Sequence, residues 1–223
     1  MHMIAKENLR ILIADDYDIV REGTCAVVER HPGWVVCGTA KTGREAVELT
    51  ARLKPDVVVM DMAMPELNGL DATRQIKKLP VPPEVLIFSA HETDELIREV
   101  FEAGAIGFIN KTEAHTDLIE GIESVSRHAP FFTARVFKIL FADEGGPSKG
   151  SGDQPQAGQR LSTREREIVQ LLAEGKSNKE VASAFGLSIR TVETHRATVM
   201  RKLGVDSVAG LVRYAIRHHM IEA

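Results

Sequence analysis

Acidic side chains follow two apolar segments of this chain, at positions where carboxylates could do chemistry. The stretch DVVVMDMAMPELNG, residues 56–69, has an apolar run that ends at Asp61. Asp15 and Asp16 follow the earlier apolar segment 10–14 in the same way. A carboxylate can act as a nucleophile and form an aspartyl phosphate, and clustered carboxylates favour a hard cation with oxygen ligands. Alone, Asp15 or Asp16 would more often be an ordinary helix N-cap, and Asp61 alone would be weak evidence because many αβ loops contain an Asp.

The elements that carry these carboxylates decide whether they meet. Between residues 9 and 127, short apolar segments alternate with segments in which apolar residues have helical spacing. The apolar segments are 10–14, 34–39, 57–60, 85–88 and 106–109. Such alternation predicts a parallel sheet with helices on both faces, and right-handed crossovers favour a doubly wound order of five strands. The fold class expected for this half is therefore α/β and flavodoxin-like.

Polar residues follow most of these strands, at the edge of the sheet where such folds bind ligands. Ser89 follows the fourth strand and Lys111 the fifth. The flavodoxin-like order places the first and third strands side by side, which brings Asp15, Asp16 and Asp61 together. Carboxylates so close to one another favour Mg²⁺, which takes one or two carboxylates with phosphate oxygens and water. Lys111 and the Ser89 hydroxyl suit other phosphoryl oxygens. Separately, Ser89 could be a cap and Lys111 a solvated charge, but their joint placement favours a phosphoryl site.

The first half of the chain resembles a known family in four segments, LIADDYDIVREG, VVVMDMAMPELNG, IFSAHE and GAIGFINK. They are similar to the receiver domain of two-component response regulators, and the family's D-x-x-M-P-x-x-N-G pattern is complete from Asp61 to Gly69. The resemblance implies that Asp61 is the phosphoacceptor. It implies a Mg²⁺ site of Asp15, Asp16, Asp61 and the backbone carbonyl of Ala63, and phosphoryl-binding and switch positions at Ser89, Phe108 and Lys111. One departure is Thr112, which stands where many relatives have proline.

Charge and composition divide the chain into two halves. Residues 1–160 carry 18 Lys and Arg against 25 Asp and Glu, a net charge of −7, whereas residues 161–223 carry 10 against 7, a net charge of +3. Opposite charges suggest that the halves do different jobs. Residues 142–160, ADEGGPSKGSGDQPQAGQR, are rich in Gly, Ser, Pro and Gln and have no apolar periodicity. This composition predicts a flexible linker.

The second half has helical periodicity throughout, with Ser or Thr before the expected helices. A short helix, a small turn at Gly186 and a longer helix from Ser188 to Gly204 are followed by a further helix. This order is typical of a helix-turn-helix, whose second helix enters the major groove of DNA. We therefore expect an all-α domain of four helices at residues 161–223.

The longer helix is expected to have one inward face, at Val192, Val199 and Leu203. The outside and flanks are left to Thr191, Glu193, Thr194, His195, Arg196, Ala197, Arg201 and Lys202. Arg and Lys on such a helix suit DNA phosphates, which position a protein without specifying sequence. A charged helix face can also be merely solvated, but the net charge and the turn-helix arrangement favour DNA.

Residues 161–205 resemble the LuxR/FixJ-type DNA-binding domain. Glu165 lies in that family's R-E-x-E opening, and TVETH at residues 191–195 matches its T-V-x-x-H signature. Glu193 departs from the family, since many relatives carry Lys there. The resemblance implies double-stranded DNA as a partner.

These observations predict a receiver domain at 9–127, a connecting helix and flexible linker at 128–160, and a DNA-binding domain at 161–223. The expected function is that of a transcriptional response regulator of the NarL/FixJ type. A histidine kinase or a small phosphodonor would phosphorylate Asp61, and the chain would bind paired half-sites as a homodimer. It is not expected to be an enzyme, apart from its own phosphorylation and autodephosphorylation.

Two alternatives to this function stay open. One is a phosphorylation-independent DNA-binding regulator with a vestigial receiver, against which the complete set of Asp15, Asp16, Asp61, Ser89 and Lys111 argues. The other is an aspartyl-phosphate phosphohydrolase, which also has a nucleophilic Asp at the end of a strand. That family needs a second Asp two residues later, where this chain has Ala63.

The sequence favours a cytoplasmic location. The longest apolar runs have the length of strands, so no membrane-spanning helix is expected. No apolar signal-peptide core precedes Lys6 and Glu7. Cys25 and Cys37 lie in apolar surroundings without metal-like spacing, which predicts buried, reduced thiols.

Overall fold

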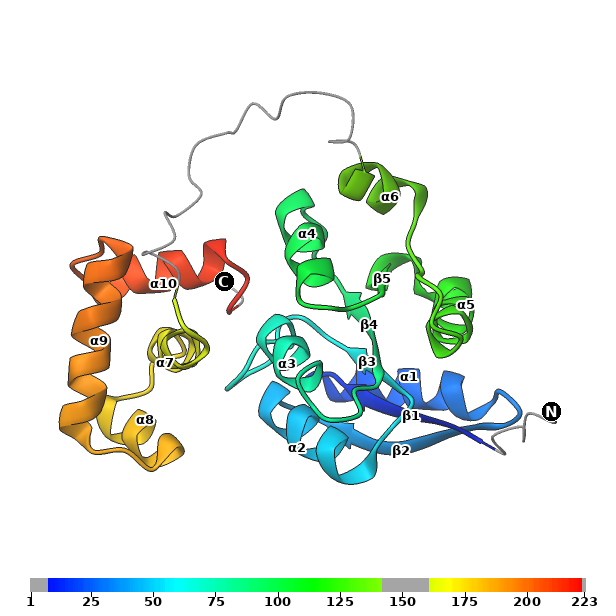
Figure 1. The fold of residues 1–223 in the computed structure, drawn as a ribbon, viewed down its shortest axis with the longest axis horizontal. Helices are drawn as coiled ribbons and strands as arrows, with labels where there is room; N and C mark the ends of the chain where they lie inside the picture. Colours follow the sequence, from blue (N-terminus) through cyan, green and yellow to red (C-terminus); the bar gives the residue numbers. More distant parts are fainter. Residues whose placement is uncertain (1–7, 142–160, 222–223) are drawn as a thin grey trace. The chain divides into compact units, whose positions relative to one another are not determined.

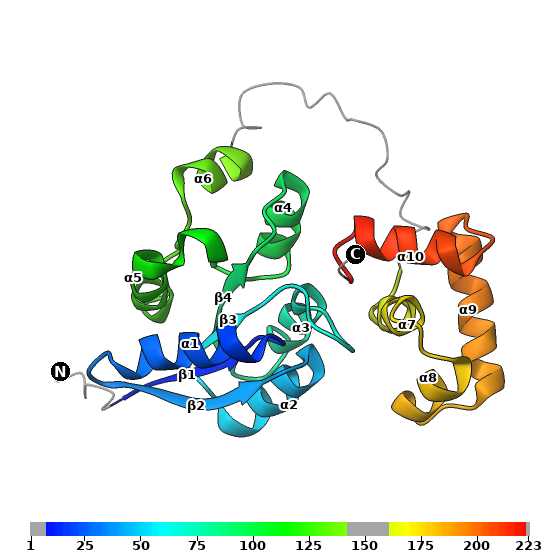
Figure 2. The same cartoon turned by 180° about the vertical axis from the view of Figure 1, so that it is seen from behind.

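The chain forms two compact units, Met1–Gly145 and Gly146–Ala223. The computed structural model describes residues 8–141 and 161–221. Each unit has a hydrophobic core of its own, and Figures 1 and 2 show both units from opposite sides. The linker expected at residues 142–160 lies outside the described residues.

The N-terminal unit is built on a five-stranded parallel sheet with the order β2-β1-β3-β4-β5. Its strands are β1 (Leu9–Ala14), β2 (Trp34–Ala40), β3 (Val57–Met60), β4 (Glu84–Ser89) and β5 (Gly107–Asn110). Ala14 pairs with Met60, so β1 and β3 end at the same level. The flavodoxin-like α/β fold expected from the sequence is confirmed. Four of the five strands differ from their expected ranges by one residue at one or both ends, and Ser89 is the last residue of β4 and does not follow it.

Helices cover both faces of the sheet (Figures 1 and 2). α1 (Asp18–Glu29) and α5 (Ala114–Ser126) pack on one face, and a short 3₁₀ helix, η1 (Lys111–Glu113), precedes α5. α2 (Gly43–Leu53), α3 (Gly69–Ile76) and α4 (Asp94–Glu102) cover the other face. Side chains of a strand alternate between the two faces, and in β1 Ile11 and Ile13 belong to one core while Leu12 and Ala14 belong to the other. Burial on both faces explains the uninterrupted apolar runs of the sequence.

The backbone after α5 extends the sheet by one short bridge beside β5. Phe131 and Gly107 form an isolated parallel bridge. The Phe131 N–H donates to the Ile106 carbonyl, and the Phe131 carbonyl accepts from the Phe108 N–H, both at 2.9 Å. These bonds satisfy edge groups of β5 that would otherwise lack partners in the sheet.

A further helix, α6 (Ala134–Phe141), packs against α4. Val136 is fully buried and Ile139 is 8% exposed, and both belong to the core on the α4 side of the sheet. The Phe132 ring meets the Phe101 ring edge-on, with centroids 5.7 Å apart. Arg135 lies 3.5 Å from Glu92 and 3.6 Å from Asp94. α6 lies within the range where the sequence suggests a connecting helix, but it is built into the core of the N-terminal unit.

The C-terminal unit is all-α, as expected, with α7 (Thr163–Ala173), α8 (Asn178–Phe185), α9 (Ile189–Leu203) and α10 (Val208–Arg217). Capping boxes begin α7 at Ser162 and α8 at Ser177, in which a serine hydroxyl and a glutamate three residues later satisfy N–H groups of the first turn. Gly186 and Gly204 end α8 and α9 with φ of 63° and 64°, a conformation that favours glycine.

The expectation for the two cysteines is partly wrong. Cys25 and Cys37 are free thiols, but each is half-buried and not fully buried. Cys37 lies in β2, an edge strand of the sheet, and Cys25 lies at the margin of the core between α1 and the sheet. Burial raises the pKa of both thiols.

Among the helices of the described residues, none combines the length and apolar character that a bilayer span requires.

The packing of α6 can be tested with Val136→Ala. Because this side chain is fully buried, we expect its truncation to lower the free energy of unfolding of the N-terminal unit by about 1.5–3 kcal/mol. Urea unfolding followed by the fluorescence of Trp34, the single tryptophan of the chain and part of this unit, measures the loss. Lys138→Ala, at an exposed position of the same helix, is the control. An equal effect of both variants would contradict the role of α6 in the core.

Candidate functional site

Three carboxylates and a lysine meet at the carboxyl edge of the sheet. Asp15 and Asp16 follow β1, Asp61 follows β3, and one oxygen from each lies within 4.8 Å of the others. Asp15 is 2% exposed and Asp61 is 4% exposed. Lys111, the first residue after β5, places its Nζ 2.8 Å from Oδ2 of Asp15 and 2.9 Å from Oδ1 of Asp61. The structure therefore brings together the four charged residues that the strand ends predict.

The charges of this cluster do not balance. Burial raises the pKa of Asp61 to about 6, and Asp15 adds to this effect while Lys111 opposes it. Burial would lower the pKa of Lys111, but the combined attraction of Asp61 and Asp15 raises it. When Asp61 is ionised, three carboxylates stand against one ammonium, which leaves two negative charges uncompensated. A divalent cation with oxygen ligands supplies this charge, so the residues fit Mg²⁺.

The turn after Asp61 is fixed by close backbone contacts. The Asn68 side chain accepts from the Asp71 N–H at 2.8 Å and caps α3. The Gly69 N–H donates to the Met62 carbonyl at 2.9 Å. A Cβ at Gly69 would lie 1.9 Å from the Asp61 carbonyl oxygen, so a larger residue would displace the backbone of Asp61. Ala63, whose carbonyl is an expected metal ligand, is half-buried in this turn.

The two expected switch residues lie on neighbouring strands and on the same side of the sheet. Ser89 is 1% exposed, and its Oγ accepts from the His91 N–H at 3.1 Å. Phe108 is 1% exposed and pairs in register with Ile87, two residues before Ser89. The Phe108 ring belongs to the core that α4 and α6 cover. Ser89 is therefore buried at the carboxyl end of β4, and the Phe108 ring is turned into the core.

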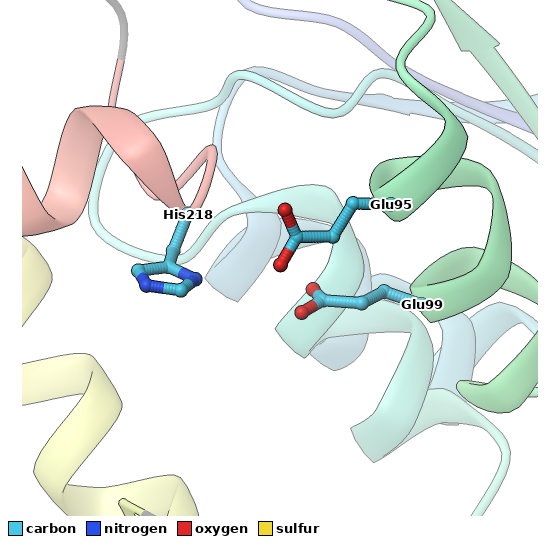
Figure 3. Close-up of side chains that lie close together, drawn as sticks. All are labelled: Glu95, Glu99 and His218. Carbon is cyan, nitrogen blue, oxygen red and sulfur yellow. The ribbon is translucent and has the colours of Figure 1, made fainter. Parts of the chain in front are cut away.

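Two other carboxylates form a weaker cluster. Glu95 and Glu99 lie one turn apart on α4 and project to the same side (Figure 3). Glu95 is exposed, and exposed acidic pairs are common without a metal. Figure 3 also labels His218, which follows α10 in the C-terminal unit, where its ring centroid lies 4.2 Å from that of Tyr214. We assign no metal to these side chains.

Four of the residues expected to contact DNA share one outward face of α9. Glu193, Thr194, Ala197 and Arg201 line a shallow surface groove, which Arg190 and Thr198 complete. The inward residues Val192 and Val199 are fully buried, as expected. Arg190 and Thr198 are not among the DNA contacts that the sequence predicts. Their helical spacing of three or four residues from Thr194 and Arg201 is the signal that would have found them.

The other four expected DNA contacts do not line this groove. The Thr191 hydroxyl hydrogen-bonds to the cap residue Ser188 at 2.8 Å, and His195 is half-buried. Arg196 lies on another flank of the helix, where it lines a small pocket with Lys176.

Lys202 joins α9 to the start of α7. Its Nζ donates to Oε2 of Glu165 at 2.8 Å. Although burial acts to raise the pKa of Glu165, hydrogen bonds from Lys202 and Ser162 lower it. Glu165 also closes the capping box of α7. The sequence placed Lys202 among the DNA contacts, whereas the structure gives its ammonium a partner within the C-terminal unit.

Comparison with known proteins finds relatives of both units. Residues 11–123 match the family model described as "Response regulator receiver domain", and residues 159–215 match the one described as "Bacterial regulatory proteins, luxR family". The transcriptional regulatory protein MctR of Rhizobium johnstonii is 33% identical over 98% of both chains. The transcriptional regulatory protein LiaR of Bacillus subtilis is 33% identical over 96% of this chain and 99% of its own.

Solved structures with a similar fold cover nearly the whole chain. A structure of the RcsB response regulator of Salmonella typhimurium is 26% identical, with a TM-score of 0.57 over 93% of this chain and 98% of that one. The response regulator ChrA of a heme-sensing two-component system is 27% identical, with a TM-score of 0.51 over 96% of this chain and 100% of that one.

The charge of the cluster should make the free energy of unfolding depend on pH. The pKa of Asp61 is raised in the folded state from 3.8 to about 6, so this group favours folding only while it is protonated. Its contribution is fully present below about pH 4 and is lost as the pH rises through about 6. We therefore expect Asp61→Asn in metal-free buffer to be more stable than the wild type at about pH 7.5, by up to about 3 kcal/mol, and not at about pH 4.

Urea unfolding followed by Trp34 fluorescence at the two pH values measures this difference. Asp94→Asn, which neutralises an exposed carboxylate of α4, is the control for general charge effects. A gain of stability for Asp61→Asn that is the same at both pH values would contradict the prediction.

Proposed function

This chain belongs to the response regulators that join a receiver domain to a LuxR-family regulatory domain, and we propose that Mg²⁺-dependent phosphorylation of Asp61 controls its activity. The observation that carries the proposal is the buried cluster at the carboxyl edge of the sheet, in which Lys111 contacts both Asp15 and Asp61. The same family membership makes the chain a transcriptional regulator. We place it in the cytoplasm, where a kinase and DNA are both within reach.

The chemistry is a phosphoryl transfer to a carboxylate. An Asp61 oxygen forms a bond to phosphorus while the bond between phosphorus and the donor, a phosphohistidine of a histidine kinase or a small phosphodonor, breaks. Mg²⁺, when bound, would neutralise charge on the phosphoryl oxygens, and Asp15, Asp16, Asp61 and the Ala63 carbonyl would hold it. Lys111 lies within 3 Å of Asp61 and would hold another phosphoryl oxygen. Later attack of water on phosphorus would return the free carboxylate, which is the autodephosphorylation expected of such a site.

Ser89 and Phe108 support a route from this site to the rest of the receiver. The Ser89 hydroxyl, which accepts a hydrogen bond from the His91 N–H, has a proton to donate to a phosphoryl oxygen. Movement of β4 toward the phosphoryl group would open space on the side of the sheet where Phe108 lies. We propose that this change favours a homodimer, which binds two half-sites in double-stranded DNA.

The outward face of α9 supports DNA recognition in the major groove. Arg190 and Arg201 line its groove and suit phosphate oxygens. Glu193, exposed near the start of the helix, can accept from the exocyclic amine of cytosine. The set of DNA contacts proposed from the sequence also includes Thr191, Thr194, His195, Arg196, Ala197 and Lys202.

Two other functions have less support. A phosphohydrolase needs a second carboxylate two residues after the nucleophile, and Ala63 cannot supply it. A vestigial receiver would not need Lys111 to contact two buried carboxylates. Burying like and opposite charges in one small cluster lowers the stability of the fold, and a vestigial receiver would gain no function in return.

The nucleophile can be tested with Asp61→Asn. The amide has the shape of the carboxylate but is not nucleophilic, so we expect it to take up no phosphoryl group from acetyl phosphate and Mg²⁺. Intact-mass measurement over time follows the transfer, and Asp94→Asn should react at the wild-type rate. Phosphorylation of Asp61→Asn on another aspartate, at the wild-type rate, would contradict the assignment of Asp61 as the phosphoacceptor.

The base-reading role of Glu193 can be tested by site selection on random duplexes. We expect Glu193→Lys to change the selected half-site and to raise affinity for non-specific DNA. Arg201→Ala should instead weaken binding to all sequences about equally and lower the salt dependence. If Glu193→Lys selected the same motif as the wild type, Glu193 would be a solvated charge, paired at most with Arg190 or Arg196 for a few tenths of a kcal/mol, roughly.

A further inference from the structure

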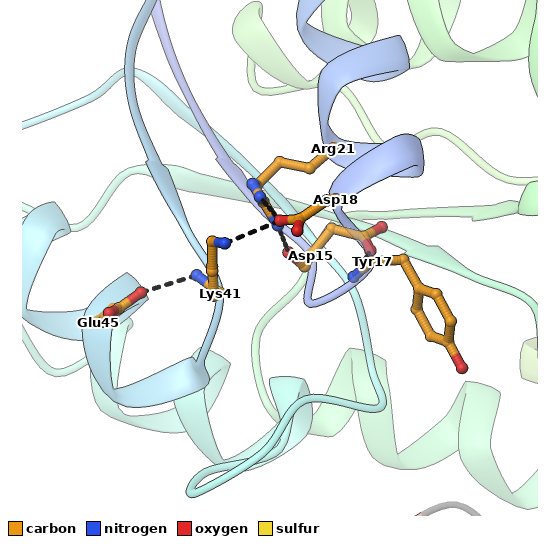
Figure 4. Close-up of polar contacts among 6 residues, drawn as sticks. All are labelled: Asp15, Tyr17, Asp18, Arg21, Lys41 and Glu45. Atoms are coloured by element: carbon orange, nitrogen blue, oxygen red, sulfur yellow. Dashed lines mark hydrogen bonds and ion pairs between the residues drawn. The ribbon is translucent and has the colours of Figure 1, made fainter.

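The loop that carries Asp15 and Asp16 is held by a buried arginine that the proposed chemistry does not use (Figure 4). Arg21 lies in the first turns of α1, and its side chain is 9% exposed. Its Nη1 donates to the backbone carbonyl of Asp15 at 2.8 Å, and this bond is buried. Its Nη2 pairs with the carboxylate of Asp18. The guanidinium thus has two fixed partners on the turn between β1 and α1.

The same arginine is linked to the end of the neighbouring strand. Lys41, directly after β2, places its Nζ 2.8 Å from the Asp18 carboxylate that Arg21 contacts (Figure 4). The Lys41 N–H donates to Oε2 of Glu45 at 2.8 Å, which fixes Lys41 at the start of α2. The hydrogen bonds from Lys41 and Arg21 lower the pKa of Asp18 to about 2. Asp18 therefore joins the two basic side chains.

Arg21 contacts the carbonyl oxygen of Asp15, and the position of this oxygen affects the orientation of Asp16. The Asp15 carbonyl is half of the planar peptide that joins Asp15 to Asp16, so fixing its oxygen fixes the plane of that peptide. The other groups of Asp15 are also held, since its N–H donates to the Ala40 carbonyl at 3.1 Å and its Oδ1 accepts from the Tyr17 N–H at 3.0 Å. The direction in which Asp16 leaves the backbone thus depends on the peptide that Arg21 holds.

We propose that Arg21 is a positioning residue for the cation site: it sets the Asp15–Asp16 peptide so that both carboxylates face one Mg²⁺, and Asp18 and Lys41 hold the guanidinium in place. This inference rests on the proposed function, because it concerns the same site. Arg21 acts through the backbone carbonyl of Asp15 and is not itself a ligand. Partners of metal-binding groups of this kind change metal affinity about 10- to 100-fold when they are removed.

The experiment measures the Mg²⁺ dissociation constant of the full chain by titration calorimetry, without a phosphodonor. We expect Arg21→Gln to bind Mg²⁺ at least about 10-fold more weakly than the wild type. The Mg²⁺ concentration that gives half the maximal rate of phosphorylation by acetyl phosphate should rise by the same factor. The rate at saturating Mg²⁺ should stay close to that of the wild type, because Asp61 and Lys111 are unchanged.

The matched control is Arg10→Gln. Arg10 lies at the other end of β1, and its Nη2 donates to the Leu53 carbonyl at 2.9 Å, a bond of the same kind and nearly the same length. We expect this variant to keep the Mg²⁺ affinity of the wild type, whatever it does to stability. A purely structural role of Arg21 predicts that the two variants behave alike, with lower free energies of unfolding and unchanged Mg²⁺ affinity, and that result would overturn the proposal.

Two milder variants keep the test decisive if Arg21→Gln does not fold. Arg21→Lys keeps the positive charge, but its single ammonium cannot contact both Asp15 and Asp18 as the planar guanidinium does. We therefore expect it to weaken Mg²⁺ binding by a smaller factor than Arg21→Gln does. Lys41→Gln removes only the exposed pair with Asp18 and should change the affinity about 2-fold or less. Wild-type affinity in Arg21→Lys would contradict the inference. Absence of Mg²⁺ binding by the wild type would instead contradict the proposed function.

Discussion

The repulsion among three carboxylates at one edge of the sheet is the constraint on which the rest of the N-terminal unit depends. Asp15, Asp16 and Asp61 would separate in water, and the fold holds one oxygen of each within 4.8 Å of the others. Parallel pairing of β1 with β3 ends both strands at the same level. The close turn at Gly69 keeps the Asp61 backbone in place. Lys111 offsets part of the charge, and the remainder is the charge that Mg²⁺ would balance in the proposed function.

In the proposed function, a change at the carboxylate site would affect α4 and α6 through the core that contains Phe108. Phe108 is packed in a core that it shares with residues of α4 and with Val136 and Ile139 of α6. Interiors of this density do not deform smoothly, so a shift of the Phe108 ring requires neighbouring side chains to repack. Among the described residues, α6 is also the last helix of the N-terminal unit. In the proposed function, a change at Asp61 would reach α6 through this shared core.

Much of this structure could be predicted from the sequence, because local patterns determine it. The apolar runs and the polar residues that follow them located Asp15, Asp61 and Lys111, and the caps and glycines located the helices of the C-terminal unit. What escaped prediction depends on contacts between distant segments. Nothing near α6 in the sequence indicates that it packs on α4, and the pair of Lys202 with Glu165 joins residues that are 37 positions apart. Arg21 looks like one charge among many on α1 until the structure places its guanidinium on the Asp15 carbonyl.

If the buried carboxylate cluster is the Mg²⁺ site, the cation should bind there and at no other acidic group. Titration of Mg²⁺ into the metal-free chain tests it most directly when the wild type is compared with Asp16→Asn and with Glu95→Gln, which alters the exposed acidic pair of α4 shown in Figure 3. We expect one Mg²⁺ per chain, greatly weakened binding in Asp16→Asn, and unchanged binding in Glu95→Gln. Binding that survives in Asp16→Asn but is lost in Glu95→Gln would contradict it.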